Sequence, residues 1–346
     1  MTNSPLLSVR DLRVTFDVHR NGDLPWSPPH QLHAVGGVDF DLMAGQTLGI
    51  VGESGSGKST LARALIGLTP ATGQAIWADG VNLIGLPARK MLSYRGDIQM
   101  IFQDPLASLN PRMTVGQIIA EPLITHHRGL SRAEVKSRVK DMMDRVGLLP
   151  NQINRYPHEF SGGQCQRIGI ARALIVRPKL IICDEPVSAL DVSIQAQVIN
   201  LLAELQRDLG LALIFIAHDL AVVRHISHRV LVMYLGRIME LADAEALYAA
   251  PDHPYTQALL SAVPSLDPSR ARHKVIVPLQ GELPSPMNPP SGCVFRTRCP
   301  RAADLCREER PLLSGPAFHQ VACHFPGPLS PAELGLEATD IALARP

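Results

Sequence analysis

The chain has 346 residues, and its 33 lysines and arginines against 32 aspartates and glutamates give a formal net charge of +1. This length allows two or three domains around a large buried core, and the near-neutral charge without a long basic stripe argues against nucleic acid as a partner. The longest strongly apolar run, residues 211–217, is too short to cross a bilayer and no signal-peptide pattern is present, so we expect a soluble, intracellular protein.

Two strand patterns come first in the chain. Apolar and polar residues alternate over residues 12–18, and strand character resumes over residues 35–42 after a loop rich in proline and glycine. An exposed aromatic residue shortly before a phosphate-binding loop can stack on adenine. Phe16 is the candidate for this contact and Trp26 the reserve, although an ordinary core position explains Phe16 equally well.

A glycine-rich stretch follows the apolar run at residues 48–51. Residues 52–59 read G-E-S-G-S-G-K-S and open a helix-like segment, which is the strand, loop and helix order of a P-loop. Glycines let backbone N–H groups point at phosphate oxygens, and the helix N-terminus adds a positive end. Lys58 can reach the β- and γ-phosphates, and the Ser59 hydroxyl can ligate Mg²⁺. The nucleotide contacts expected here are Ser54, Gly55, Ser56, Gly57, Lys58, Ser59 and Thr60.

Short strands are expected at residues 75–77 and 98–102, and Gln103 follows the second of them. A polar side chain at the carboxyl end of a parallel strand lies where open α/β sheets bind their ligands. Gln103 is therefore a candidate to contact Mg²⁺ or the attacking water. Taken alone, it is better explained as a solvated residue at a strand end.

The pattern becomes helical between residues 114 and 178 and interrupts the alternation of strands and helices, which predicts an inserted helical subdomain. Ser131 and Glu134 form a capping-box signature for a helix that runs toward Arg145. A second helix starts at Ser161, where two glycines leave the N–H groups of the first turn accessible to an anion. This weak motif consists of Ser161, Gly162, Gly163 and Gln164.

Two carboxylates end the apolar run that begins at residue 180. This pattern suits a buried parallel strand that delivers Asp184 and Glu185 to the edge of a sheet. Asp184 is placed to hold the Mg²⁺ shell, and Glu185 is placed to polarise a water for attack on the γ-phosphate. Asp191 then precedes an amphipathic helix.

A further buried strand ends at His218, which can hydrogen-bond a γ-phosphate, although a lone histidine at a strand end is more often structural. Residues 230–233 and 237–240 predict a closing hairpin.

These motifs come in one order: the P-loop, Gln103, the S-G-G-Q helix start, the two adjacent acids, Asp191 and His218. The ordered set resembles the ATP-binding subunits of ABC transporters. Residues 103–113 and the H-P-Y segment at residues 253–255 resemble the dipeptide/oligopeptide importer branch of that family. The proline-rich loop at residues 20–31 suggests the second of the two paired ATPases in that branch.

The resemblance implies an α/β fold: a P-loop NTPase (RecA-like) core with an inserted α-helical subdomain, an antiparallel β part and a cysteine-containing C-terminal extension. The expected boundaries are a nucleotide-binding core over residues 5–104, a helical subdomain with the signature motif over 105–177, the rest of the core over 178–245 and the extension over 246–346.

The resemblance also implies an ATPase that works as a head-to-tail pair with a second ABC ATPase subunit, either a different chain or a copy of itself. Glu185, His218 and Gln103 would be catalytic, while Ser59, Gln103 and Asp184 would hold Mg²⁺. The partner's nucleotide would be contacted in trans by Ser161, Gly162, Gly163, Gln164 and Asp191.

The other implied partners are two transmembrane permease subunits and an extracytoplasmic substrate-binding protein, which places the chain at the cytoplasmic face of the bacterial inner membrane. The expected cargo is di- and oligopeptides. A metal chelate, glutathione or an opine-like compound is the alternative cargo, and an ABC ATPase outside transport is a further alternative.

Four cysteines lie near the C-terminus, with arginines between the first three. In a cytosolic protein such thiols favour a metal site over a disulfide framework. Their spacing is wider than the C-x₂₋₄-C pairs of zinc knuckles, and four cysteines also suit the [4Fe–4S] cluster that some peptide-importer ATPases carry. We expect the cluster, with zinc second and unliganded thiols as the remaining alternative. The four residues are Cys293, Cys299, Cys306 and Cys323.

Overall fold

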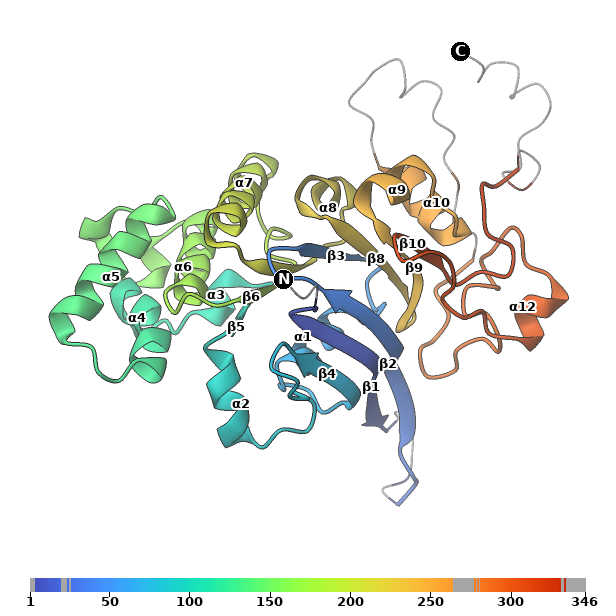
Figure 1. Ribbon diagram of the computed structural model, residues 1–346, viewed down its shortest axis with the longest axis horizontal. Helices are drawn as coiled ribbons and strands as arrows, with labels where there is room; N and C mark the ends of the chain where they lie inside the picture. The colour runs from blue at the N-terminus through green and yellow to red at the C-terminus, as the bar shows by residue number, and fades with distance from the viewer. Residues whose placement is uncertain are drawn as a thin grey trace, which may run out of the picture.

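A large β-sheet lies at the centre of the protein (Figure 1). The computed structural model describes residues 4–19, 24, 26–263, 277, 279, 281–330 and 333. Within them, the large sheet has seven strands in the order β10-β9-β8-β3-β7-β6-β5. Strands β8, β3, β7, β6 and β5 run parallel, whereas β9 and β10 each pair antiparallel with their neighbours. The strands are β3 (Thr47–Val51), β5 (Ile98–Ile101), β6 (Leu180–Asp184), β7 (Ala212–Ile216), β8 (Arg229–Tyr234), β9 (Arg237–Asp243) and β10 (His319–Val321).

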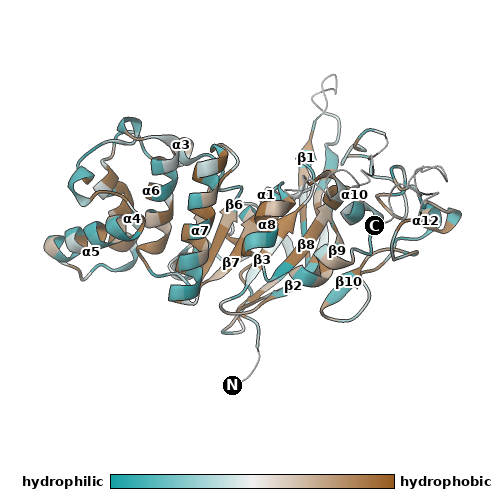
Figure 2. Ribbon diagram, turned by 90° about the horizontal axis from the view of Figure 1, so that it is seen from above, coloured by the Kyte–Doolittle hydropathy of each residue, from teal (hydrophilic) through white to brown (hydrophobic). Residues whose placement is uncertain are grey.

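The parallel strands are buried on both faces, as their continuous apolar runs predict. Every residue of β3, β6 and β7 is buried. Alternate residues of β6 enter two different hydrophobic cores: Ile181 and Cys183 join the core that continues into the helices, and Leu180 and Ile182 join the core shared with the smaller sheet. Figure 2 shows this apolar character concentrated on the central strands. The buried strands therefore hold the residues at their carboxyl ends in fixed positions.

The smaller sheet has the antiparallel order β2-β1-β4. Its strands are β1 (Leu7–Val18), β2 (His30–Leu42) and β4 (Thr72–Trp77). The two strands predicted ahead of the P-loop are confirmed and are longer than expected. The proline-rich loop expected at residues 20–31 lies partly outside the described residues, and β2 begins within it at His30.

Helices occupy the chain between β5 and β6, and Figures 1 and 2 both show α4, α5 and α6 at one end of the molecule. The predicted helix starts are confirmed, because Ser131 and Ser161 each form a capping box with the residue three positions later. The expected domain boundaries remain predictions. The segment contains α3 (Pro105–Ser108), α4 (Val115–His126), α5 (Arg132–Arg145), the short 3₁₀ helices η1 (Pro150–Gln152) and η2 (Pro157–Glu159), and α6 (Gly162–Leu174).

The C-terminal segment joins the core by adding a strand to it. The predicted hairpin is confirmed as β8 and β9, and β10 pairs with β9 at the sheet edge, with His319 opposite Ala242. In Figures 1 and 2, α12 lies at the end of the molecule opposite α5. The remaining helices are α1 (Lys58–Leu65), α2 (Ala88–Arg95), α7 (Val192–Leu209), α8 (Leu220–Ile226), α9 (Ala244–Ala249), α10 (Pro254–Ala262) and α12 (Asp304–Glu308).

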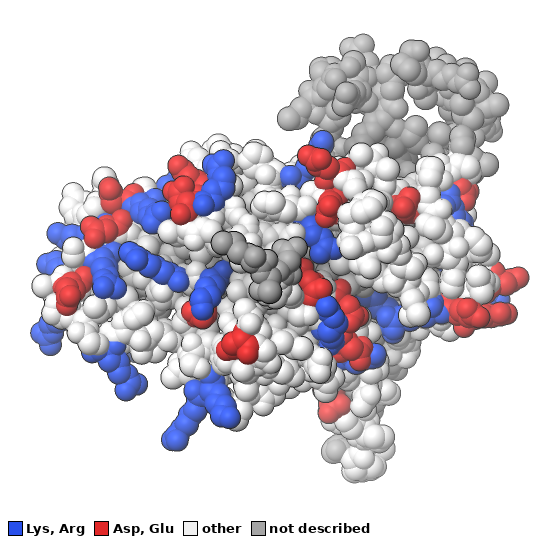
Figure 3. Space-filling model, in the orientation of Figure 1, with Lys and Arg blue, Asp and Glu red and all other residues white. Residues whose placement is uncertain are grey.

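Charged side chains of both signs are mixed on the face that Figure 3 shows. Among the described residues on this face, lysines and arginines alternate with aspartates and glutamates, and they form no continuous basic stripe of the kind that tracks a nucleic-acid backbone.

Candidate nucleotide-binding site

A cavity of about 470 Å³ lies where the strands β3, β5, β6 and β7 end. It is lined by residues of the P-loop and by residues that lie within two positions of the ends of three of these strands. Because the carboxyl ends of parallel strands meet at one edge of the sheet, residues far apart in sequence converge there. The residues with predicted roles that line it are Phe16, Ser54, Gly55, Gly57, Lys58, Ser59, Thr60, Gln103, Glu185 and His218.

The P-loop backbone requires glycine at its close approaches to neighbouring segments. Gly57 has a φ of 101°, and a Cβ atom there would lie 2.3 Å from the carbonyl oxygen of Ala34. The N–H of Gly236, in the β8–β9 turn, donates to the carbonyl oxygen of Ser56 at 2.8 Å. The loop is therefore held between β2 and the hairpin, with α1 starting at its end.

Lys58 is buried, and its ammonium group is held above the loop by backbone oxygens. Its Nζ donates to the carbonyl oxygens of Gly52 at 2.7 Å and Glu53 at 2.9 Å. Burial lowers the pKa of Lys58, while the carboxylates of Glu185, Asp184 and Glu53 act in the opposite direction. The site thus combines one buried cation with acids that favour its charged form.

The pair formed by Ser59 and Asp184 fits a divalent cation. The Ser59 hydroxyl donates to Oδ1 of Asp184 at 2.6 Å, while Oδ2 of this buried carboxylate has no hydrogen-bond partner among the described residues. Burial raises the pKa of Asp184, and the hydrogen bond from Ser59 opposes that rise. An unpaired buried carboxylate oxygen is costly, and a magnesium ion would satisfy it together with the serine hydroxyl.

An acid, an amide and an imidazole meet beside this pair. Oε2 of Glu185 accepts a hydrogen bond from Nε2 of Gln103 at 2.9 Å and lies 4.0 Å from Nδ1 of His218. Glu185 has a φ of 47°, which is uncommon for a residue with a side chain, and its N–H donates to the carbonyl oxygen of Ile216 at 3.0 Å. The turn after β6 therefore directs this carboxylate into the cavity beside side chains that follow β5 and β7.

The aromatic candidates differ in position. Phe16, in β1, has 38% of its surface exposed and lines the cavity, whereas Trp26 is 77% exposed and is not among the lining residues. Sequence reasoning did not anticipate the other lining residues, which are Leu32, His33, Ala34, Leu235, Gly236 and Pro286. A predicted pairing of β1 with β2 would have found Leu32, which lies opposite Phe16.

The signature residues lie outside this cavity. Ser161 caps α6: its Oγ accepts from the N–H of Gln164 at 3.3 Å, and both Ser161 and Gly162 are exposed. Asp191 caps α7 and accepts from the N–H of Ile194 at 3.0 Å. A Cβ atom on Gly163 would lie 2.6 Å from Cγ2 of Ile194, so the two helix starts pack side by side.

The four C-terminal cysteines are free thiols, of which Cys293 and Cys306 are buried and Cys299 and Cys323 are half-buried. The N–H of Cys293 donates to the carbonyl oxygen of Cys306 at 2.8 Å. Burial, with a smaller contribution from the neighbouring thiols, raises the pKa of Cys293 to about 11 and that of Cys299 to about 12, and burial raises the pKa of Cys323 as well. However, no group of three or more His, Cys, Asp or Glu side chains in the described part of the chain is arranged to hold a metal ion. The described residues therefore give no support to the metal centre expected from the sequence.

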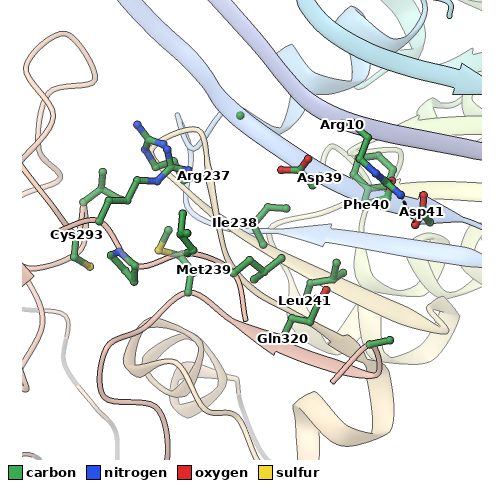
Figure 4. A pocket seen from close by; sticks show the side chains of 18 of the residues that line it. Arg10, Asp39, Phe40, Asp41, Arg237, Ile238, Met239, Leu241, Cys293 and Gln320 are labelled. Atoms are coloured by element: carbon green, nitrogen blue, oxygen red, sulfur yellow. Dashed lines mark hydrogen bonds and ion pairs between the residues drawn. The ribbon is translucent and has the colours of Figure 1, made fainter. Parts of the chain in front are cut away.

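A second cavity, of about 490 Å³, separates the C-terminal extension from the smaller sheet (Figure 4). Arg10 is paired there with Asp41 at 2.8 Å, and Nη1 of Arg237 donates to the carbonyl oxygen of Gly36 at 3.0 Å. Cys293 also lines it, and the cavity shares no lining residue with the one around the P-loop.

Comparisons with known proteins agree with this geometry. Residues 35–188 match the family model described as ABC transporter, and residues 239–306 match that of the oligopeptide/dipeptide transporter C-terminal region. The oligopeptide transport ATP-binding protein OppF of Salmonella typhimurium is 65% identical over 319 residues, which cover 92% of this chain and 95% of that protein. The chain belongs to the ABC transporter family.

Other members of the ABC transporter family are similar to this one in sequence or in structure. OppF of Escherichia coli is 64% identical over the same shares of both chains. The solved structure of cbiO1 from Clostridium perfringens, part of the ABC transporter complex cbiONQ, has a TM-score of 0.60 at 27% identity and covers 71% of this chain and 91% of that one. The ATP-binding cassette MJ0796, solved as a dimer bound to ADP and Pi, has a TM-score of 0.61 at 27% identity over 69% and 98% of the two chains. Among the described residues, no helix combines the length and apolar character needed to span a membrane.

Proposed function

We propose that this protein is the ATP-hydrolysing subunit that energises a membrane importer of di- and oligopeptides. The observation that carries the proposal is the convergence of the P-loop, Gln103, Glu185 and His218 on one cavity of a chain 65% identical to an oligopeptide transport ATP-binding protein. The permease subunits, the substrate-binding protein and the location at the cytoplasmic face of the inner membrane follow from this function.

Each residue in or beside the cavity would have one role in ATP hydrolysis. The N–H groups of the P-loop and Lys58 would hold the phosphates, and Ser59, Asp184 and Gln103 would hold Mg²⁺, which neutralises charge on the transferred phosphoryl group. Glu185 would orient and deprotonate the attacking water, positioned by its hydrogen bond to Gln103. His218, 4.0 Å from that carboxylate, would contact the γ-phosphate.

We further propose that the signature residues Ser161 to Gln164, with Asp191, act on the nucleotide of a partner ATPase. Two observations support this: the N-terminus of α6 is exposed, and none of these residues lines the cavity of its own chain. An open helix N-terminus attracts phosphate, so a second subunit docked on this end would close the site from the other side. The helices between β5 and β6 would then form the subdomain that passes the movement to the permeases.

We also propose that the four cysteines hold a metal centre, with a [4Fe–4S] cluster as the first choice and zinc as the second. Burial raises the pKa of Cys293 and Cys299 and the neighbouring thiols add to the rise, so the cysteines lie near one another, and a bound metal would stabilise their thiolate forms. Iron, sulfide and zinc would be measured on the anaerobically purified chain, with Cys299→Ser as the test and the buried Cys165→Ser as the matched control. Wild-type protein without iron, sulfide or zinc would contradict this proposal and leave free thiols.

The function is tested by assembling the chain with its permeases, partner ATPase and binding protein in proteoliposomes. We expect ATP hydrolysis stimulated by a loaded binding protein, and uptake of a tripeptide that disappears with Lys58→Ala. Uptake of glutathione or a metal chelate but not of peptides would identify the alternative cargo. ATP hydrolysis that no binding protein stimulates would favour a role outside transport.

A further inference from the structure

The C-terminal part of the chain contacts the P-loop directly, at a position that the loop's sequence pattern leaves unspecified. Nη1 of Arg298 lies 2.7 Å from Oε2 of Glu53, and the N–H of Glu53 donates to the Tyr255 hydroxyl at 2.9 Å. Glu53 is the second residue of the loop, and 245 residues separate it from Arg298. We propose that Arg298 and Tyr255 are positioning residues for the phosphate loop, and we call the three residues the Glu53 latch. This inference rests on the proposed role of residues 52–59 in binding ATP.

The ion pair in the latch is largely shielded from water. Only 8% of the Arg298 side chain and 25% of the Glu53 side chain are exposed. A charge-assisted hydrogen bond in such surroundings is stronger than one on the surface, and removing one partner leaves the other desolvated. Nη1 of Arg298 donates to Glu53, while its buried Nε has no hydrogen-bond partner among the described residues.

A cluster of aromatic rings packs around Tyr255 and Arg298 of the Glu53 latch. Tyr255 is fully buried, and its ring lies 4.9 Å from that of Tyr234 and 5.3 Å from that of Phe295, measured between centroids. These rings come from α10, from β8 and from the segment that carries the first two of the four cysteines. The guanidinium of Arg298 also lies 5.9 Å from the centroid of the Tyr234 ring. The latch is therefore a rigid point of contact rather than a pair of mobile surface side chains.

On its other side, Glu53 holds the residues that would grip phosphate. Its carbonyl oxygen accepts a hydrogen bond from Nζ of Lys58 at 2.9 Å and one from the N–H of Ser56 at 3.1 Å. The extension fixes the side chain and the N–H of Glu53, while the loop uses its carbonyl. Releasing the latch would therefore loosen Lys58 and the loop amides, and weaken ATP binding more than the chemical step.

The first experiment measures the Kd for ATP and the KM and kcat of hydrolysis in the full chain. Arg298→Gln should raise Kd and KM roughly tenfold while kcat at saturating ATP changes less than about threefold, and Arg298→Lys should recover much of the loss because it keeps the charge. The matched control is Arg301→Gln, which breaks an ion pair with Glu333 at 2.7 Å within the extension and does not contact the P-loop. A merely structural role would lower the melting temperature in both variants and leave Kd unchanged in both.

A double-mutant cycle locates the effect in the pair. Glu53→Gln and Arg298→Gln should each raise the Kd for ATP, and the double variant should bind no more weakly than the worse single variant. Additive effects in the double variant, or an unchanged Kd in Arg298→Gln, would overturn the latch. Wild-type protein that fails to bind ATP would instead overturn the proposed function, so the two failures are distinguishable.

The hydroxyl of Tyr255 is tested separately. Tyr255→Phe keeps the packed ring and removes only the acceptor for the Glu53 N–H, so we expect a rise in Kd of about threefold. Tyr248→Phe is the control, because its hydroxyl donates to the carbonyl of Leu220, away from the P-loop. Equal Kd values in these two variants would remove Tyr255 from the proposal.

Discussion

The nucleotide cavity and the four-cysteine group were both expected from residues scattered along the chain, but they differ in how the fold assembles them. Gln103, Glu185 and His218 each lie within two residues of the carboxyl end of a parallel strand, so the register of the sheet brings them together. The cysteines lie in a segment whose described regular structure is the short helix α12 and the three-residue strand β10. The sequence therefore predicts where residues lie when they flank regular elements. For residues in loops, it predicts only which side chains are present.

The largest effect is expected from the residue at the centre of the cavity. Glu185→Gln should lower kcat by about 10²–10³-fold while ATP binding is retained, because the amide keeps the shape but cannot take a proton from water. Steady-state hydrolysis and an equilibrium ATP-binding measurement separate the two. Turnover close to that of wild type would show that Glu185 is not the general base.

The backbone of the same site should be nearly as sensitive. Gly57→Ala places a Cβ atom 2.3 Å from the carbonyl oxygen of Ala34 at a φ of 101°, so the loop must move, and we expect ATP to bind at least about tenfold more weakly. Gly80→Ala is the matched control, since it shares a positive φ, meets nothing within 4 Å and does not line the nucleotide cavity. Equal losses in both variants would assign the effect to strain alone rather than to the close approach.

The residues left outside the cavity give a smaller effect that depends on a partner. Ser161→Ala removes the cap of α6 and one hydroxyl from an exposed helix start, so turnover should fall roughly tenfold at the partner's bound nucleotide and not at the nucleotide on its own P-loop. Mixing wild-type chains with chains that carry both Ser161→Ala and Glu185→Gln leaves one active composite site, which pairs the wild-type P-loop with the altered serine. Normal turnover at the site that contains the altered serine would contradict action in trans.

Local features of this chain are predictable from its sequence, whereas contacts between distant segments are not. The capping box at Ser131, the N-cap at Ser161 and the β8–β9 hairpin are confirmed because each depends on a few neighbouring residues. The wall that β2 contributes to the cavity was missed because it depends on which strands pair. The contact between Glu53 and Arg298 was missed as well, since a pair 245 residues apart leaves no local pattern.

The smallest effect is expected in the pH dependence of the free energy of unfolding. It comes from His253 in the C-terminal extension. His253 is fully buried beside Phe295, and burial lowers its pKa to about 3 from 6.5. Between these two values the unfolded chain binds a proton that the folded chain does not, so His253 makes stability fall as the pH drops from about 6.5 toward 3, by at most about 1.4 kcal/mol per pH unit. Above pH 6.5 both states are neutral and the contribution vanishes.

His253→Asn should flatten this acid limb, because asparagine can still accept the N–H of Tyr255 but takes up no proton. Urea unfolding at several pH values between 7 and 4.5 measures the slope, and His225→Asn, at an exposed position on α8, is the control. If the slope is the same in all three proteins, acid sensitivity comes from other groups. A flatter slope in His253→Asn alone would show that the buried histidine of the H-P-Y segment makes the extension side sensitive to acid.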